Sequence, residues 1–337
     1  MYIPYGRQCI EQDDIDAVVE VLRSDYVTTG PAVTDFEKAV AEYTGAKYAV
    51  AVANGTAALH VACLAAGLKK GDEVITTPIT FAASANCALY CGATPVFADI
   101  DGKTLTLTEA TVAPKVTKNT RAVIADLPGG NPCDAAALKE LCDKYGLKLI
   151  LNLDDAWTAK WNGKALVDFA DAAFVNFSND KIIDLGLSAA VVTNDVENHK
   201  LFYAYHNCGR PWGVTESTLS FDAIMGGDLR VAEWQASLLP GRLEKLPEID
   251  AMCKKQAESI LAALPAGAAV VVAEGGEAAG RGVLAKGVEG CEVYPAMHLQ
   301  PFFRDSYFET LTGCKLEYAQ GDFPVSEEAA KNVKLVK

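Results

Sequence analysis

Residues 50–59, with the sequence VAVANGTAAL, are the starting point for interpreting this chain. An apolar run that is typical of a buried strand ends at Asn54-Gly55, and a helix-compatible run begins at once with Thr56. The start of a helix leaves backbone N–H groups free and carries the positive end of the helix dipole, so it suits a phosphate. An ordinary strand–turn–helix connection in which Asn54 caps the helix explains the same residues equally well.

The same alternation of apolar strand-like runs and amphipathic helix-like runs continues through the first 200 residues. Most of the strand candidates are continuous apolar runs, which is typical of strands covered on both faces. The pattern predicts an α/β fold, with a mostly parallel seven-stranded sheet and helices on both faces, whose ligands bind at the carboxyl ends of the strands. The strand candidates are residues 47–53, 73–77, 95–98, 121–125, 148–152, 172–177 and 189–193, and the helix candidates are residues 33–43, 56–66, 82–90, 135–145 and 197–206.

The composition excludes several classes of function. The chain has 44 acidic and 30 basic residues, and its net charge of −14 opposes non-specific binding to nucleic acid. It contains no apolar run of about 18 residues, and its first residues, MYIPYGRQ, lack the layout of a signal peptide. The ten cysteines form no CxxC pair, and the four histidines are scattered. We therefore expect a reduced, cytoplasmic protein without a metal site, a nucleic-acid partner or a membrane partner.

The pattern changes after residue 230. Residues 230–264 are helix-compatible, with interruptions expected at Pro240-Gly241 and at Pro247. Residues 265–290 are rich in Ala, Gly, Val and Glu and contain two strand-like pieces. We expect a large α/β domain over residues 1–239 and a smaller, shortened α+β domain over residues 240–337.

Two residues that follow strand candidates have side chains suited to a planar carbonyl cofactor. Phe81 offers a flat surface on which such a ring can stack, although a large aromatic residue at this place is more often part of the core. Lys181 follows the strand candidate at residues 172–177, and lysine is the side chain that bonds covalently to a carbonyl such as that of pyridoxal phosphate. Taken alone, a loop lysine is usually a solvated charge.

Several stretches in a fixed order carry a family resemblance. They resemble the DegT/DnrJ/EryC1/StrS family of pyridoxal-phosphate-dependent sugar aminotransferases, which has the type I, aspartate-aminotransferase-like fold. The resemblance implies a homodimer that moves an amino group from an amino acid, glutamate, onto a keto-sugar, with nucleotide-linked sugars favoured. The stretches are IPYGRQ (3–8), DYVTTGP (25–31), FEKAVAEYTGAKYAVAVANGTAALH (36–60), GDEVITTPITFAASANCALYCGATPVFADID (71–101), NPCD (131–134), HNCGR (206–210), LRVAEWQASLL (229–239) and YPAMHLQPFF (294–303).

Carried over by position, the resemblance implies a role for several residues. The phosphate-binding backbone falls on Gly55, Thr56 and Ala57. The ring-stacking aromatic falls on Phe81, and the lysine that bonds to the cofactor falls on Lys181. Family members that dehydrate rather than transaminate have a histidine at this last position, so Lys181 resembles the transaminating branch.

Four cofactor-binding positions depart from the family's pattern. Asn152 stands where the family has the carboxylate that keeps the cofactor's ring nitrogen protonated, and an amide cannot stabilise that positive charge comparably. Asp154, two residues further along the same strand, is an alternative partner for the ring nitrogen. We predict on this basis that Asn152→Asp raises activity or cofactor affinity. The other departures are Asp155 for a histidine, Asn176 for a serine near the phosphate, and Asp228 for an asparagine donated across the dimer interface.

Three further residues are candidates for binding substrate. Arg7 and Arg230 lie in matched stretches and could bind substrate anions, although salt bridges explain both equally well. His298 could face a sugar, with aromatic packing as the alternative. Two hypotheses follow for the whole protein: a sugar aminotransferase, or a catalytically silent homologue that binds a ligand or a partner subunit.

Overall fold

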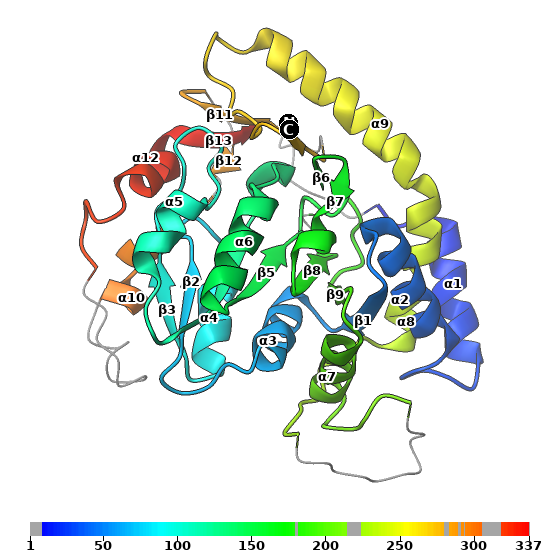
Figure 1. The fold of residues 1–337 in the computed structure, drawn as a ribbon. Coiled ribbons are helices and arrows are strands. Elements are labelled where there is room, and N and C mark those ends of the chain that lie inside the picture. The colour runs from blue at the N-terminus through cyan, green and yellow to red at the C-terminus, as the bar shows by residue number, and fades with distance from the viewer. Residues whose placement is uncertain are drawn as a thin grey trace.

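A seven-stranded sheet forms the centre of the computed structural model, which describes residues 9–178, 181–213, 224–279, 283–288, 291–292, 294–304 and 318–336. The strand order is β1-β9-β8-β5-β4-β2-β3 (Figure 1). β9 runs antiparallel to both of its neighbours, and the remaining pairs are parallel. The seven predicted strands and the mostly parallel sheet are therefore confirmed. The strands are β1 (Tyr48–Val52), β2 (Glu73–Thr76), β3 (Thr94–Phe97), β4 (Thr120–Asp126), β5 (Lys148–Asn152), β8 (Ala172–Asn176) and β9 (Ala189–Thr193).

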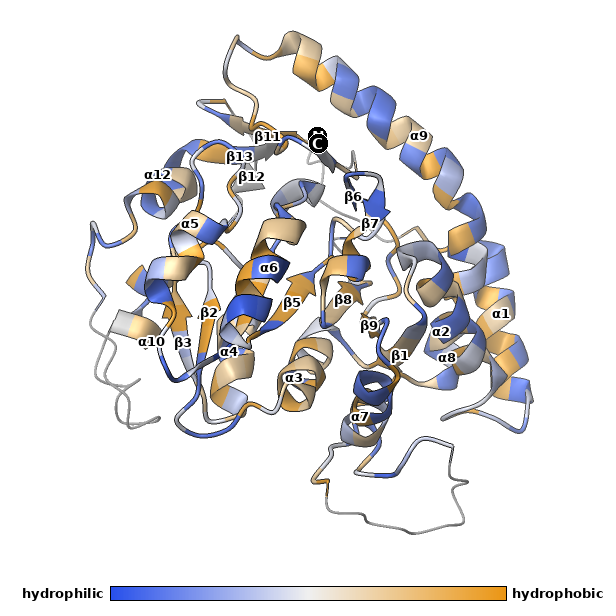
Figure 2. Cartoon of the chain, in the orientation of Figure 1, coloured by the Kyte–Doolittle hydropathy of each residue, from blue (hydrophilic) through white to orange (hydrophobic). Residues whose placement is uncertain are grey.

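Helices cover both faces of this sheet because successive residues of each strand point to opposite faces. In β8, Ala173 and Val175 belong to one core with α2 (Pro31–Thr44) and α6 (Ala135–Tyr145). Ala172 and Phe174 belong to a second core on the other face. This second core includes residues of α3 (Gly55–Ala65), α4 (Ala83–Tyr90) and α7 (Val196–His206). In Figure 2 the central strands β2, β3, β5 and β8 are mainly orange, that is hydrophobic, as expected for strands that are covered on both faces.

A long helix, α9 (Leu239–Ala263), runs along the outside of the molecule (Figure 1). The predicted interruptions are wrong, because α9 is continuous through both prolines. Pro240 lies in the first turn of α9, where a backbone N–H has no partner within the helix, so the proline removes no hydrogen bond there. Further along, Leu243 and Leu246 are buried in the core, and their burial favours a helical backbone as far as Pro247. α8 (Glu233–Ala236) precedes it, and α1 (Gln12–Arg23) is joined to it through ion pairs of Arg242 and Lys245.

The C-terminal region forms a small sheet with the order β11-β13-β12. Its strands are β11 (Val283–Lys286), β12 (Cys291–Glu292) and β13 (Val333–Val336), and the helices near it are α10 (Pro301–Arg304) and α12 (Pro324–Asn332). A third sheet joins this region to the rest of the chain, since β10 (Gly276–Glu277) pairs with β6 (Lys160–Trp161), which also pairs with β7 (Lys164–Ala165). In the large sheet region, the short helix α5 (Glu109–Val112) lies between β3 and β4 in the chain. The boundary at residues 239/240 stays a prediction.

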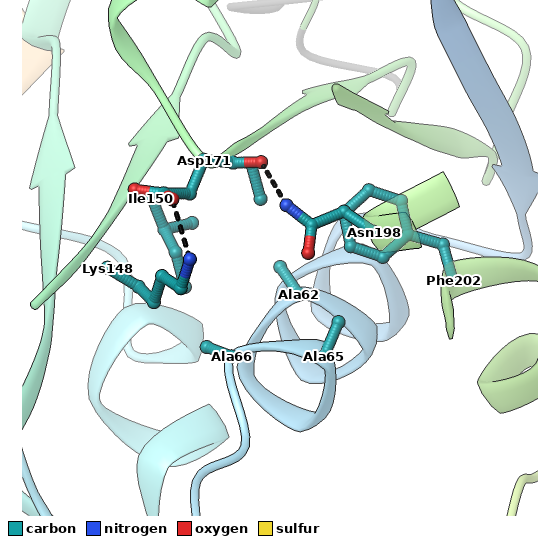
Figure 3. Close-up of a pocket in the computed structure, with 9 residues that line it drawn as sticks. Ala62, Ala65, Ala66, Lys148, Ile150, Asp171, Asn198 and Phe202 are labelled. Carbon is teal, nitrogen blue, oxygen red and sulfur yellow. Dashed lines mark hydrogen bonds and ion pairs between the residues drawn. The ribbon is translucent and has the colours of Figure 1, made fainter. Parts of the chain in front are cut away.

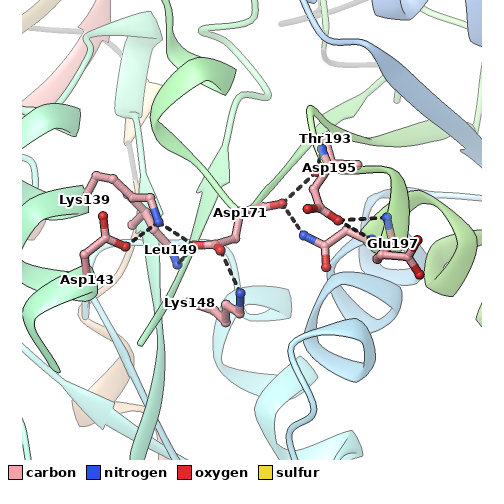
Figure 4. Close-up of polar contacts among 9 residues, drawn as sticks. Lys139, Asp143, Lys148, Leu149, Asp171, Thr193, Asp195 and Glu197 are labelled. Atoms are coloured by element: carbon pink, nitrogen blue, oxygen red, sulfur yellow. Dashed lines mark hydrogen bonds and ion pairs between the residues drawn. The ribbon is translucent and has the colours of Figure 1, made fainter. Parts of the chain in front are cut away.

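A polar network links the amino ends of the neighbouring strands β5 and β8 (Figure 4). The Asp171 carboxylate accepts a hydrogen bond from the Leu149 N–H at 3.0 Å and pairs with Lys148 at 2.9 Å and Lys139 at 3.3 Å. Its burial opposes ionisation, but these contacts outweigh that effect and hold the Asp171 pKa below its usual value. The network lies opposite the carboxyl ends of the parallel strands, so it supports the sheet without entering the expected ligand edge. Within the described residues, the structure has no helix that is long and apolar enough to cross a membrane.

Candidate active site

A cavity of about 450 Å³ opens where the parallel strands β5 and β8 end. Figure 3 shows a second hollow near the amino ends of the strands, beside Ile150 and Asp171, but its volume is only about 10 Å³. Such a volume holds about one water molecule, so the larger cavity is the candidate site. Its lining residues are Asn54, Gly55, Thr56, Leu59, Phe81, Ala83, Ser84, Asn152, Asp154, Phe174, Asn176, Ser178 and Leu187.

One wall of the cavity is the start of α3. The Asn54 side chain caps this helix by accepting a hydrogen bond from the Ala57 N–H at 2.9 Å. The cap uses the Ala57 N–H, which leaves the N–H groups of Gly55 and Thr56 in the first turn as the donors for an anion. A side chain at Gly55 would place its Cβ 3.1 Å from Asn176 Cγ, so glycine allows α3 to begin close to the end of β8. The two interpretations of this turn, cap and anion site, are thus compatible.

An aromatic ring stands at the mouth of the cavity. Phe81 lines the cavity and is 61% exposed, so it is not part of the core. An exposed phenyl ring beside a cavity is a surface on which a planar ligand can stack. Leu187 is exposed to a similar extent, 60%, and adds apolar surface to the same cavity.

The Asn152 amide is held at the end of β5 by contacts on both sides. Its Nδ2 donates a hydrogen bond to Asp126 Oδ1 at 2.6 Å, and its Oδ1 accepts one from the Asp154 N–H at 3.0 Å. Ser84 Oγ also donates to Asp126 Oδ1, at 3.2 Å. Burial raises the pKa of Asp126 to about 6, while these hydrogen bonds oppose the rise. A buried carboxyl group therefore stands directly behind the amide that lines the cavity.

Lys181 contacts two carboxylates, and one of them, Asp154, lines the cavity. Its Nζ is 3.5 Å from Asp154 Oδ2 and 3.5 Å from Asp155 Oδ1, and its side chain is only 9% exposed. Burial raises the pKa of Asp154 to about 7, and the Lys181 charge opposes that rise. The amine is therefore largely shielded from solvent and is held beside a cavity-lining residue, unlike an ordinary solvated surface lysine.

Among the described residues, the structure brings four polar residues to the site that the sequence did not single out for it. Ser84 and Ser178 line the cavity, and Ser178 Oγ accepts a hydrogen bond from Asn176 Nδ2 at 3.0 Å. Asp126 stands behind Asn152, as described above. Burial raises the pKa of the Tyr294 phenol, and the charges of Lys181 and Asp155 also act on it, so this residue brings the C-terminal region near the site. Of these four, Ser178 could have been noticed in the sequence, because it lies only three residues before Lys181.

Six described residues that were predicted for the site do not line the cavity: Ala57, Asp155, Lys181, Asp228, Arg230 and His298. Asp228 and Arg230 form a two-bonded ion pair with each other, with N–O distances of 2.8 and 3.1 Å. His298 is fully buried, its Nε2 lies 3.1 Å from Glu327 Oε1, and its ring packs against Phe323. The packing alternative therefore describes His298 better than contact with a sugar, because a residue without solvent exposure cannot meet a ligand in this conformation. Arg7 lies outside the described residues.

Comparison with curated proteins finds relatives that are named for polysaccharide biosynthesis and for GDP-perosamine synthesis. GDP-perosamine synthase from Caulobacter vibrioides is 33% identical over 240 residues, which cover 71% of this chain and 64% of that protein. The spore coat polysaccharide biosynthesis protein SpsC from Bacillus subtilis is 37% identical over 196 residues, covering 58% of this chain and 50% of the relative. The chain thus spans between half and about two thirds of the length of these relatives.

Comparisons with solved structures and with family models agree with the comparison with curated proteins. DesV from S. venezuelae, solved in complex with a ketimine intermediate, has a TM-score of 0.84 and 27% identity, covering 96% of this chain and 88% of that one. DesI, solved in the presence of its TDP-sugar product, has a TM-score of 0.82 and 26% identity, covering 98% and 86%. The model of the DegT/DnrJ/EryC1/StrS aminotransferase family matches residues 8–278. The α/β fold, the cavity at the strand ends and this match over most of the sequence together show that the chain belongs to the DegT/DnrJ/EryC1/StrS aminotransferase family.

Proposed function

We propose that this protein is a pyridoxal-phosphate-dependent aminotransferase that moves an amino group from an amino acid, glutamate, to a nucleotide-linked keto-sugar. The observation that carries the proposal is the Lys181 amine, whose side chain is 9% exposed and contacts Asp154, a residue of the cavity that is also lined by the start of α3 and an exposed aromatic ring. Relatives named as a GDP-perosamine synthase and as DesI with a TDP-sugar support a nucleotide-linked acceptor. As the family resemblance implies, we also propose a homodimer with its sites at the subunit interface, and a cytoplasmic location.

The cavity's donors and surfaces fit pyridoxal phosphate. The first turn of α3 suits the phosphate, and the Phe81 ring suits one face of the pyridine. Asp154 Oδ1 and Asn176 Oδ1 are buried oxygen atoms without a hydrogen-bond partner among the described residues, and both residues line the cavity. Buried polar atoms of this kind are usually satisfied by a ligand or by water. When bound, the cofactor carries the amino group between the two substrates and its ring withdraws electrons from the reacting carbon.

Lys181 would bond to the cofactor and, once released, would move a proton at the substrate carbon. Asp154 and Asp155 hold the amine in place through contacts of 3.5 Å. The pKa of Asp154, raised by burial to about 7, allows this group to take up or give off a proton near neutral pH.

We infer that Asp154 is better suited than Asn152 to face the ring nitrogen. Both residues line the cavity, but the Asn152 amide already bonds to Asp126 and to the Asp154 N–H. Asp154 Oδ1 is the buried acceptor without a described partner, and a carboxylate stabilises a protonated ring nitrogen better than an amide does. With this assignment, the departure at Asn152 does not remove the carboxylate that the proposed reaction needs.

The test uses the purified full chain with added pyridoxal phosphate. Reduction with borohydride fixes a lysine-bound cofactor, and mass spectrometry locates it. We expect the label on Lys181, no label at that site in Lys181→Ala, and an unchanged label in Lys164→Ala, which replaces an exposed lysine of β7. Glutamate added to the loaded protein should release one equivalent of 2-oxoglutarate. A different labelled lysine overturns the site, whereas labelling of Lys181 without 2-oxo-acid release from any amino acid supports the silent homologue.

A further inference from the structure

A chain of hydrogen bonds runs behind the cavity, from the loop that carries Phe81 to the end of β5. Thr80 Oγ1 donates to Ser84 Oγ at 2.9 Å, and Ser84 Oγ donates to Asp126 Oδ1 at 3.2 Å. Asn152 Nδ2 donates to the same carboxyl oxygen at 2.6 Å. The Thr80, Ser84 and Asp126 side chains are buried. Asp126 is therefore the point at which donors from two walls of the cavity meet.

The pairing of the strands explains why Asp126 and Asn152 are neighbours. They are the last residues of β4 and β5, and they face each other in the register of these two parallel strands. Side chains of register partners lie on the same face of a sheet. Asp126 does not line the cavity, whereas its two donors, Ser84 and Asn152, do. Asp126 would thus act on a bound ligand through its neighbours.

The Asp126 carboxylate determines which way round the Asn152 amide lies. A carboxylate only accepts hydrogen bonds, whereas an amide accepts through its oxygen and donates through its nitrogen. In the observed orientation Asn152 Nδ2 faces Asp126, and Asn152 Oδ1 accepts a hydrogen bond from the Asp154 N–H at 3.0 Å. A flipped amide would set two acceptor oxygens against each other at Asp126 and two N–H groups against each other at Asp154. The carboxylate therefore fixes the orientation in which Asn152 binds the Asp154 backbone.

We propose that Asp126 is a positioning residue that acts through the Asn152 amide on Asp154. The inference rests on the proposed function, in which Asp154 faces the ring nitrogen of pyridoxal phosphate. The bond from the Asp154 N–H to Asn152 restrains the backbone that carries the Asp154 side chain at the cavity wall. Ser84 holds the other side of the Asp126 carboxyl group, so contacts on two sides fix the group that orients the amide.

Support of the sheet alone is the alternative role for Asp126, and Asp171 provides the comparison. The Asp171 carboxylate accepts a hydrogen bond from the Leu149 N–H at 3.0 Å at the opposite edge of the same sheet, and neither residue lines the cavity. Loss of either carboxyl group removes hydrogen bonds within the fold and should lower the free energy of unfolding. Only loss of Asp126 should also change the binding of the cofactor.

The first experiment measures the dissociation constant of pyridoxal phosphate for the full chain by equilibrium dialysis. Asp126→Ala should raise this constant about tenfold, as expected for the loss of a hydrogen bond to a charged group. Asp126→Asn keeps an oxygen that accepts from both neighbours, so its constant should stay within about twofold of wild type. Asp171→Ala should leave the constant unchanged. Equal weakening by Asp126→Ala and Asp171→Ala, or no rescue by Asp126→Asn, would overturn the proposal.

A double-mutant cycle tests whether Asp126 acts through the amide. When Asn152 is already alanine, the further change Asp126→Ala should alter the dissociation constant by less than about twofold, because the amide that it orients is missing. Two single effects that simply multiply would show that Asp126 acts independently of Asn152 and would contradict the proposal.

Hydrogen exchange without cofactor separates this inference from the proposed function. In the ligand-free protein, the Asp154 backbone N–H should exchange about tenfold faster in Asp126→Ala than in wild type or in Asp126→Asn. The Leu149 N–H should be unchanged in these proteins and should exchange faster in Asp171→Ala. Unchanged exchange at Asp154 in Asp126→Ala would overturn the inference and leave the proposed function intact. Faster exchange in a protein that binds no pyridoxal phosphate would instead overturn the proposed function, and with it the role of Asp126 toward the cofactor.

Discussion

Asn152 and Asp126 share one short hydrogen bond, and this contact changes the expected effect of a substitution at either residue. The amide donates at 2.6 Å to a carboxyl group whose pKa burial raises to about 6. Asp126 Oδ2 has no partner among the described residues, so the carboxyl group is only partly satisfied. The sequence alone led to the prediction that Asn152→Asp raises activity or cofactor affinity, but it did not reveal the carboxyl group behind the amide.

Asn152→Asp should place two carboxyl groups within hydrogen-bond distance. Because both cannot ionise at that separation, the folded variant retains a proton that the unfolded chain releases above about pH 4. A folded-state pKa that is raised in this way makes stability fall as the pH rises. We expect a loss of about 3 kcal/mol relative to wild type at pH 8 and little loss at pH 4. Urea unfolding across this pH range measures the difference.

The control for this prediction is the exchanged pair, Asp126→Asn with Asn152→Asp. It restores one carboxyl group and one amide, so most of the lost stability should return at pH 8. The carboxylate would then line the cavity, but because Asp154 is the proposed partner of the ring nitrogen, the affinity for pyridoxal phosphate should stay close to that of wild type. A stability loss in the single variant that does not change with pH would contradict the argument.

Among the elements, α3 combines a structural cap and a ligand-binding end within one turn. The Asn54 cap stabilises the helix, and the turn that it orders holds the Gly55 and Thr56 N–H groups at the cavity wall. α6 has a comparable cap, because Asp134 accepts a hydrogen bond from the Ala137 N–H at 2.9 Å. The cavity-lining residues include none from α6, so this helix is a matched control.

Asn54→Ala and Asp134→Ala should each lower the free energy of unfolding by about 1 kcal/mol, the usual cost of losing a cap. Only Asn54→Ala should also weaken the binding of pyridoxal phosphate, by about three- to tenfold, because the anion-binding turn loses its order. Urea unfolding measures the first effect, and equilibrium dialysis measures the second. Equal loss of cofactor affinity in the two variants would mean that global stability, and not the α3 turn, controls binding.

At the scale of the whole molecule, the C-terminal region packs against the strand ends of the large sheet. Phe97 of β3 packs edge-on against Phe303 and Phe323, with centroid distances of 5.4 and 6.3 Å. The Asp99 carboxylate accepts hydrogen bonds from the first turn of α12, from the Val325 N–H at 3.1 Å and from Ser326 Oγ at 2.6 Å. These contacts connect regions that are more than 200 residues apart in the sequence.

Asp99→Ala should remove the anchor of α12, because a carboxylate at a helix start both accepts N–H bonds and interacts favourably with the helix dipole. We expect a loss of about 1–3 kcal/mol in local stability, seen as faster amide hydrogen exchange in α12 with little change in α3. Asp35→Ala, which breaks an exposed ion pair with Lys38, should change neither. Uniformly faster exchange in the Asp99 variant would show that the contact supports the whole fold and not only α12.

The sequence by itself determined the strands of the central sheet and the helices between them. A strand that is buried on both faces must be apolar throughout, so β5 and β8 are visible in the local pattern without knowledge of their neighbours. The cap at Asn54 can also be recognised in the sequence, because the N–H group that it binds belongs to Ala57, only three residues away. Only the tertiary structure decided that Asp126 stands behind Asn152, that Tyr294 lies near Lys181, and that His298 is buried against Glu327. These contacts depend on strand order and on how distant segments pack, which a local pattern of residues does not encode.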